Sequence, residues 1–312
     1  MISLRAFVVA AGATLALASA HTTPAAAQKS TATEKLNAYV GCINRLSARA
    51  YDSQSRYFSW AAKSGPTGKE RIIYGTYTIY DTDDCKKNVE SANALEPRDA
   101  ALEAAASAYV SAVTTLGPLL KEADDYYTQE NYKDDKMAKG KALHPKLVAA
   151  WDAFSAADKN LRAGVDAIND KRKLEQLKQI EAEEGKKTRY YVEAVMIDAK
   201  RVLRLQDTDK PDINEITKAV SDYEATVKGF EDANAADGGK VSSMFGSNAK
   251  SVLVTSKQLM RRIRDKVPYT SGQKMMMQPG SAWMVEGSPA RLLRDYNQLV
   301  DSYNSIARFG MR

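Results

Sequence analysis

Long hydrophobic runs are missing from most of this sequence. The one extended apolar stretch runs from Ala6 to Ala20, and even this is short for a membrane span, which needs about 20 apolar residues. It follows the single positive charge of Arg5 and precedes Ala25-Ala26-Ala27, a cleavage site of small residues. That order is typical of a secretory signal peptide, whereas the alternative, a membrane anchor, needs a longer run. We therefore expect residues 1–27 to be removed on export.

A lipid-bearing cysteine directly after the apolar run is also missing, because the first cysteine is Cys42. We expect a mature chain that begins near Gln28, has no lipid anchor and no transmembrane segment, and resides in the periplasm or is secreted. Cys42 and Cys85 are the two cysteines of the chain. In an oxidising compartment an even number predicts a disulfide, although two buried free thiols remain the alternative.

Histidine is almost absent, and His144 is the one that remains after residue 27. Catalytic arrangements that need two histidines and most zinc sites are therefore excluded. The HExxH and GxSxG motifs and a glycine-rich phosphate loop are missing too. The stretch SNAK at 247–250 fits the S-x-x-K pattern but lacks its companion motifs. We predict that the protein is not an enzyme and needs no cofactor.

Charge of one sign is only slightly in excess. The net charge is +6, and removal of Arg5 with the signal peptide lowers it to +5. This excess is compatible with an anionic partner, such as lipid headgroups or a cell-wall polymer, without requiring one. An envelope protein is a further candidate partner, and nucleic acid is excluded for an exported chain.

Apolar residues recur at steps of three and four along most of the mature chain, which is the spacing of one helix face. Around 70–85 this pattern gives way to a stretch rich in Ile, Tyr and Thr, which favours an extended conformation. The sequence leaves open whether the helix over 134–206 is continuous, and Gly185 is its weak point. Helices are expected over about 33–62, 84–129 with a break at Pro97 and a kink at Gly117-Pro118, 134–206, 212–233, 247–266 and 289–306.

The predicted fold is therefore all-α: an elongated antiparallel helical bundle with long coiled-coil-like helices and one short extended segment, in a single domain over 28–312. If the extended segment retraces the first helix, Cys85 comes level with Cys42. An extended chain covers about 3.3 Å per residue and a helix about 1.5 Å, so the distances allow the disulfide.

The first and last helices contain similar phrases, KLNAYVGCIN at 35–44 and RDYNQLVDSYN at 294–304. Each places two asparagines seven residues apart beside an apolar seam: Asn37 and Asn44, then Asn297 and Asn304. One interpretation is that they are polar flanking positions. The other is that they bridge neighbouring helices and set their register, in which case the first and last helices pack side by side.

Three motifs follow one another along the chain: LNAYVGCIN near the start, EADDYYTQENYKDDKMAKGKALHPKL at 122–147 and GSPARLLRDYNQLVDSYN near the end. In these motifs the chain resembles the YiiG-like family, a domain of unknown function in bacterial envelope proteins. The resemblance implies an all-helical, elongated domain and no known activity. Many members of that family look like lipoproteins, and the lack of a lipid-bearing cysteine is a departure from them. The resemblance in the central motif, at 122–147, rests on Tyr126, Tyr127, Tyr132, Asp134, Asp135, Gly140, Leu143 and His144.

Two groups of side chains are candidates for binding. The first is the acidic stretch Asp124, Asp125, Glu130, Asp134 and Asp135 with His144, which could hold a divalent cation but fits helix capping better, because acidic residues favour the start of a helix. Its tyrosines fit a core role better than ligand stacking. The second is the basic group Arg261, Arg262, Arg264 and Lys274 beside Met275-Met276-Met277 and Trp283. It is either a solvated face and a cap over the bundle core, or an anion-binding end and a partner surface.

From these patterns we expect an exported structural or binding protein of the cell envelope. The alternative is a periplasmic carrier of an anionic ligand or lipid that binds through the basic, Met-rich end.

Overall fold

The computed structural model describes residues 24–206, 208, 210–278 and 280–309, with no side-chain description for 24–30, 307 and 309. Every regular element in these residues is a helix, which confirms the predicted all-α class. None of the described helices is long and apolar enough to cross a membrane. The expected signal peptide falls almost entirely outside the described residues.

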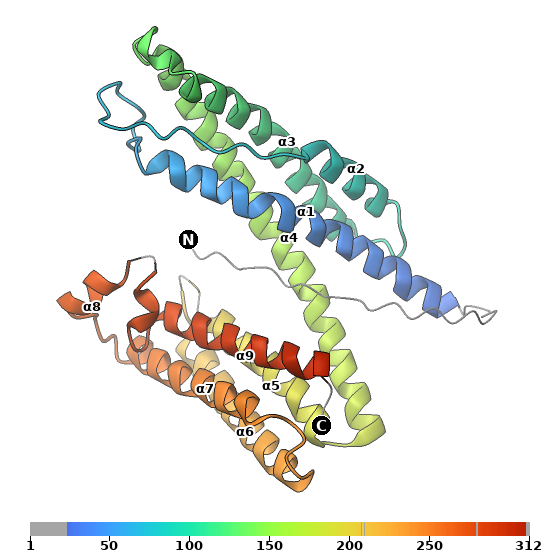
Figure 1. The fold of residues 1–312 in the computed structure, drawn as a ribbon. Coiled ribbons are helices and arrows are strands. Elements are labelled where there is room, and N and C mark those ends of the chain that lie inside the picture. Colours follow the sequence, from blue (N-terminus) through green and yellow to red (C-terminus); the bar gives the residue numbers. More distant parts are fainter. Residues whose placement is uncertain (1–23, 207, 209, 279, 310–312) are drawn as a thin grey trace. The chain divides into compact units, whose positions relative to one another are not determined.

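Contacts divide the chain into two compact units, with the boundary between Ile168 and Asn169. The first unit contains α1 (Pro24–Phe58), α2 (Thr82–Asn93), α3 (Ala100–Thr128), the 3-10 helix η1 (Asn131–Lys133) and the first part of α4 (Ala138–Glu184) (Figure 1). The second contains the end of α4 and all later helices. Each unit has a core of its own, and the single domain over 28–312 stays a prediction.

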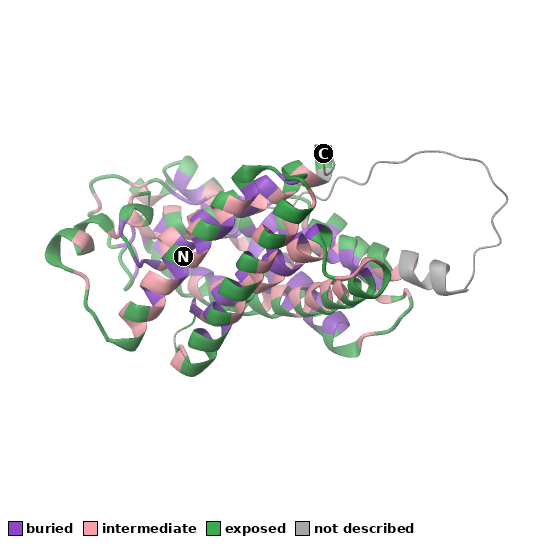
Figure 2. Ribbon diagram, turned by 90° about the horizontal axis from the view of Figure 1, so that it is seen from below, coloured by how far each residue is buried: buried purple, intermediate pink, exposed green. Residues whose placement is uncertain are grey.

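The core of the first unit lies between α1, α2, α3 and α4. The predicted apolar face of α1 is buried, as are the facing side chains of the other helices (Figure 2). Burying a large apolar side chain stabilises a fold by about 1.5–3 kcal/mol, so these faces hold the unit together. The buried side chains of α1 and α4 include Leu36, Tyr39, Ile43, Leu46, Ala50 and Tyr57 of α1, with Leu143, Leu147, Trp151, Phe154 and Leu161 of α4.

Residues 59–81 join α1 to α2 without regular secondary structure, apart from an isolated bridge between Ala62 and Gly65. The chain returns along α1 (Figure 1), which is the path that would bring Cys85 level with Cys42. Side chains of α1 hold it there: Arg56 Nε donates to the Tyr74 carbonyl at 2.8 Å, and Arg49 Nε donates to the Thr78 carbonyl at 3.3 Å. We call residues 70–81 the return segment.

A disulfide joins Cys42 of α1 to Cys85 of α2, with the two Cα atoms 5.3 Å apart. This is the pairing that the sequence predicts. Both cysteines are buried in the core of the first unit. The bond therefore closes the loop that contains the return segment.

The long helix predicted over 134–206 is interrupted. The structure ends α4 at Glu184 and begins α5 (Thr188–Gln206) four residues later. Gly185 lies at the interruption with φ of +76°, a conformation that costs a side-chain-bearing residue about 1 kcal/mol. By contrast, α3 continues through Pro118 and α4 through Pro145.

The second unit is a bundle of four helices: α5, α6 (Ile213–Ala236), α7 (Ser243–Arg264) and α9 (Pro289–Phe309). Contacts join α5 to α6, α6 to α7, α7 to α9, and α9 back to α5. The Asp212 side chain caps α6, since it accepts from the Asn214 and Glu215 amides. Helix α7 starts four residues earlier than predicted because Ser242 caps it. The apolar residues that recur at steps of three and four along α6 are buried: Ile216, Val220, Tyr223, Val227 and Phe230.

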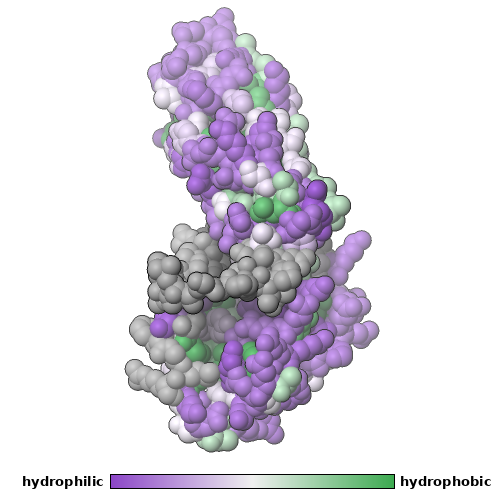
Figure 3. Space-filling view, turned by 90° about the vertical axis from the view of Figure 1, so that its right-hand side faces the viewer, coloured by the Kyte–Doolittle hydropathy of each residue, from purple (hydrophilic) through white to green (hydrophobic). Residues whose placement is uncertain are grey.

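Between α7 and α9 the chain forms the short helix α8 (Ser271–Met276) and the 3-10 helix η2 (Ala282–Met284). Hydrophilic side chains cover most of the face seen in Figure 3, and its apolar side chains occur in small groups.

Candidate functional site

The residues of the central motif, at 122–147, lie where α3 ends and α4 begins. Tyr126 donates its hydroxyl hydrogen to Asp135 Oδ1 at 2.8 Å. Asp135 also accepts from the backbone amides of Ala138 at 3.2 Å and Lys139 at 2.9 Å, so it caps the N-terminus of α4. The Lys139 amide is the main cause that lowers the pKa of Asp135. This carboxylate is therefore held by the helix end, as the capping interpretation predicts, whereas Asp134 is exposed.

His144 is buried, and both of its ring nitrogens have a partner. Nε2 lies 3.1 Å from the Lys63 carbonyl and Nδ1 lies 3.0 Å from the Tyr57 hydroxyl. A carbonyl can only accept, so Nε2 donates to Lys63, and in that tautomer Nδ1 accepts the hydroxyl hydrogen of Tyr57. No ring nitrogen is left to bind a metal or a substrate.

Aromatic rings fill the space around Tyr57. Its centroid lies 5.2 Å from that of Trp60, 5.4 Å from Trp151 and 5.8 Å from His144. Burial raises the pKa of Tyr57 to about 12 and raises that of Tyr127 further. Offset and edge contacts of this kind are worth about 0.5–1.5 kcal/mol each beyond the burial of area. We call Tyr57, Phe58, Trp60, Tyr126, Tyr127, Tyr132, His144 and Trp151 the aromatic core.

Glycines let the backbone approach the aromatic core. A Cβ on Gly140 would lie 2.5 Å from Met137 Sδ and 3.0 Å from the Tyr127 hydroxyl, so a side chain here would force these buried neighbours to shift. Gly75 of the return segment has φ of +68° and lies against Tyr127, where an added Cβ would be 3.2 Å from Tyr127 Cβ. The residues of the central motif therefore form a closely packed, filled region.

Within the described residues no group of three or more His, Cys, Asp or Glu side chains is arranged to hold a metal ion. Asp125 forms an ion pair with Lys121 at 2.9 Å, and Glu130 forms one with Lys133 at 2.5 Å. These carboxylates are paired along their own segments and do not converge on His144.

Two buried charged groups of the first unit are not among the residues predicted from the sequence. Asp158 of α4 is buried and accepts from Ser47 at 2.6 Å, from Tyr51 at 3.0 Å and from Arg162 at 2.9 Å. The signal that could have found it is its position on the apolar face of α4, seven residues after Trp151 and three before Leu161. A buried carboxylate needs such partners, because an unpaired one costs several kcal/mol.

The second group is the buried pair Lys35 and Glu103, whose Nζ and Oε1 lie 2.5 Å apart. Arg98 adds two hydrogen bonds to the Glu103 carboxylate from Nε and one from Nη2 at 2.7 Å. The bonds from Arg98, followed by that from Lys35, hold the pKa of Glu103 well below its usual range.

The basic candidates lie at the end of α7 and in α8. Arg262 donates to the carbonyls of Val267 and Pro268 and stacks over Tyr269 at 4.2 Å. Arg264 forms two hydrogen bonds with its neighbour Asp265. Arg261 and Lys274 are exposed, and their side chains make no hydrogen bond to the described residues. The structure therefore uses Arg262 to hold the loop and leaves two of the four cations facing solvent.

The Met-rich loop beside them is exposed. The exposed fraction is 78% for Met275, 44% for Met284 and 37% for Trp283. Between Lys257 and Arg294 the chain has eight basic and two acidic residues, a net charge of +6. This equals the net charge of the whole chain, so the excess is concentrated beside the exposed loop.

All four candidate register residues, Asn37, Asn44, Asn297 and Asn304, are exposed. This placement agrees with polar flanking positions. The α1 pair belongs to the first unit and the α9 pair to the second, so the register role that would join them stays a hypothesis.

The class that these observations define is an all-helical protein whose signature residues form a filled aromatic core. Comparison by sequence then identifies the family: the chain belongs to the family described as "Protein of unknown function (DUF3829)", whose model matches residues 30–305. It is 43% identical over 278 residues to the "Uncharacterized protein YiiG" of Escherichia coli (strain K12), covering 88% of this chain and 78% of that protein. No solved structure matches the chain.

Proposed function

We propose that the protein is exported and acts as a non-catalytic structural or binding component of the bacterial cell envelope. The export part rests on the order of Arg5, the apolar run and Ala25-Ala26-Ala27. The observation that carries the non-catalytic part is the aromatic core, where both nitrogens of His144 are occupied. A histidine that acts as a general base or a metal ligand needs a ring nitrogen that can reach the substrate or the metal.

Co-sedimentation of the mature chain with purified cell wall and with anionic vesicles, at low and high salt, tests this function. We expect binding to cell wall that survives high salt, because a site built from shape and hydrogen bonds is screened less than surface charge. Absence of the chain from the envelope fraction of cells, or no binding to either material, would contradict the proposal.

A second candidate, a carrier of an anionic ligand or lipid, is favoured by the exposed Met-rich loop and by the net charge of +6 between Lys257 and Arg294. Apolar side chains rimmed by cations bind anionic lipid surfaces through partial insertion and charge attraction. The double change Met275→Ser and Met284→Ser is expected to weaken vesicle binding severalfold. Met244→Ser is the matched control, because Met244 is 63% exposed elsewhere in the same unit. Equal loss in both variants would sink this candidate.

A further inference from the structure

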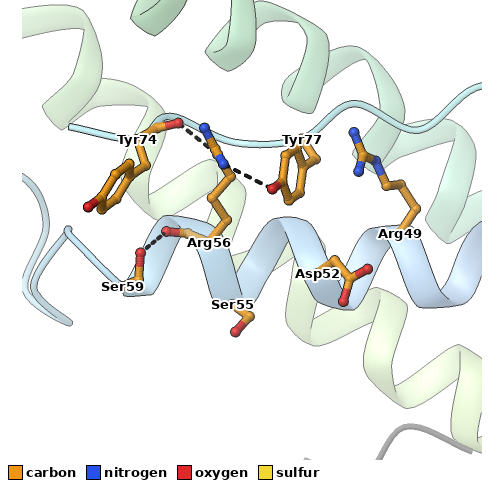
Figure 4. A pocket seen from close by; sticks show the side chains of 7 residues that line it. All are labelled: Arg49, Asp52, Ser55, Arg56, Ser59, Tyr74 and Tyr77. Carbon is orange, nitrogen blue, oxygen red and sulfur yellow. Dashed lines mark hydrogen bonds between the residues drawn. The ribbon is translucent and has the colours of Figure 1, made fainter.

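A shallow groove runs between α1 and the return segment of the first unit (Figure 4). Neither the predicted sites nor the family description covers it. Its walls combine two guanidinium groups, one carboxylate, hydroxyl groups and two phenol rings. The residues that line it are Arg49, Asp52, Ser55, Arg56, Ser59, Tyr74 and Tyr77.

The groove contains a row of alternating rings and guanidinium groups, in the order Tyr74, Arg56, Tyr77, Arg49 (Figure 4). The Tyr77 centroid lies 4.4 Å from Arg56 Cζ and 3.9 Å from Arg49 Cζ, and the Tyr74 centroid lies 5.7 Å from Arg56 Cζ. Arg49 and Arg56 are two helical turns apart on one face of α1. The Tyr77 ring of the return segment contacts both guanidinium groups.

Several polar groups of the groove are not used by the described residues. Arg49 donates through Nε alone, which leaves its two Nη groups, and Arg56 uses Nε and Nη1, which leaves Nη2. The Asp52 carboxylate and the Ser55 hydroxyl are exposed and have no hydrogen bond to the described residues. Tyr74 is 48% exposed, so part of its ring faces solvent.

We propose that this groove binds an acidic carbohydrate chain, that is, a saccharide whose sugar rings carry carboxylates. The exposed ring of Tyr74 offers the flat apolar surface on which a pyranose ring can stack, with its hydroxyl as a polar handle. The two free Nη groups of Arg49 match a carboxylate in the paired geometry that lysine does not offer, and the free Nη2 of Arg56 adds a single charged donor. Asp52 and Ser55 accept hydrogen bonds from sugar hydroxyls.

Asp52 decides between this ligand and a bare anion. A phosphate or an isolated carboxylate gains nothing from a second carboxylate in the groove and is repelled by it. A sugar chain has hydroxyl donors for Asp52 and carboxylates for the arginines. The proposal rests on the export part of the proposed function, because acidic glycans are polymers of the cell exterior.

Isothermal titration of the mature chain with hexagalacturonate, an oligomer of uronic acid, tests the proposal. We expect saturable binding that weakens in salt, and no binding of the neutral cellohexaose of the same length. Tyr74→Ala and Arg49→Gln are expected to weaken binding about fivefold to tenfold. Tyr80→Ala is the matched control, since Tyr80 is 70% exposed on the same segment and does not line the groove. Thermal unfolding of each variant checks the fold.

Asp52→Ala adds the sharpest test. It is expected to weaken uronate binding severalfold, whereas stronger binding of uronate or of inorganic phosphate would overturn the proposal in favour of a simple anion site. Absence of uronate binding, or equal affinity in the Tyr74 and Tyr80 variants, would overturn it as well. If those results coincide with undiminished sedimentation on cell wall, the groove assignment fails while the proposed function stands.

Discussion

The single hydroxyl of Ser53 satisfies both backbone hydrogen-bonding groups of Tyr77. It donates to the Tyr77 carbonyl at 2.7 Å and accepts from the Tyr77 amide at 3.0 Å. Two such bonds are what a neighbouring strand supplies in a sheet. At Tyr77, a helix side chain thus takes the place of a partner strand.

Ser53→Ala is therefore expected to lower the free energy of unfolding by about 1–3 kcal/mol, because it leaves an amide and a carbonyl without partners. Ser55→Ala, at an exposed position two residues on, is the matched control and should change stability by less than about 0.5 kcal/mol. Urea denaturation measures both. Equal stability of the two variants would show that the hydroxyl does not hold the segment.

Removal of the disulfide by Cys42→Ala and Cys85→Ala is expected to cost about 4 kcal/mol. The bond closes a loop with a sequence separation of 43 residues, and the loss follows from the chain entropy that the unfolded state regains. Urea denaturation with and without reducing agent gives the comparison. Reduction should destabilise the native chain and leave the double variant unchanged; an effect of the reductant on that variant would reveal another cause.

The lowered pKa of Glu103 makes stability depend on pH. A carboxyl whose folded pKa lies below its unfolded value near 4.5 stabilises the fold above that pH. The contribution is lost progressively as the pH falls below about 4.5. We expect Glu103→Gln to be less stable than the native chain at pH 7, with the difference shrinking on acidification to pH 3.

The control for this pH dependence is Glu90→Gln, at an exposed glutamate of α2. It should follow the native chain over the whole range. A difference between native chain and Glu103→Gln that is the same at pH 7 and pH 3 would contradict the assignment.

His144→Ala is expected to lower the free energy of unfolding by about 2–4 kcal/mol, since it opens a cavity and leaves the Lys63 carbonyl unpaired. Tyr57→Phe removes one hydrogen bond and keeps the ring, so a loss of about 0.5–1.5 kcal/mol is expected. Lys146→Ala, exposed on the same helix, is the control. Thermal or urea unfolding measures the stability of the three variants. A larger loss of stability in Tyr57→Phe than in His144→Ala would contradict the role given to the imidazole.

The sequence predicted the helices well because their apolar spacing is a local property. The apolar faces of α1 and α6 follow directly from that spacing. The weak point at Gly185 follows from the residue type. The return segment was predicted for a similar reason, since runs of Ile, Tyr and Thr disfavour a helix.

The partners of side chains could not be predicted in the same way. Tyr57 and His144 are 87 residues apart in the chain, and no spacing rule connects two residues so distant. The groove at Arg49 and Arg56 could not be predicted from the spacing on α1, because the tyrosine between their guanidinium groups comes from another segment. The basic group near Arg262 was recognised as a group, but its division into loop contacts and free cations depends on the path of the loop.

The position of the disulfide has a consequence for a chain exposed to proteases. Residues 59–81 have no regular secondary structure apart from the bridge between Ala62 and Gly65, so a protease can cut here more readily than within the helices. Every bond in that range lies between Cys42 and Cys85. A cleaved chain would therefore remain a single covalent molecule until it was reduced, with both cut ends still tied to the same core.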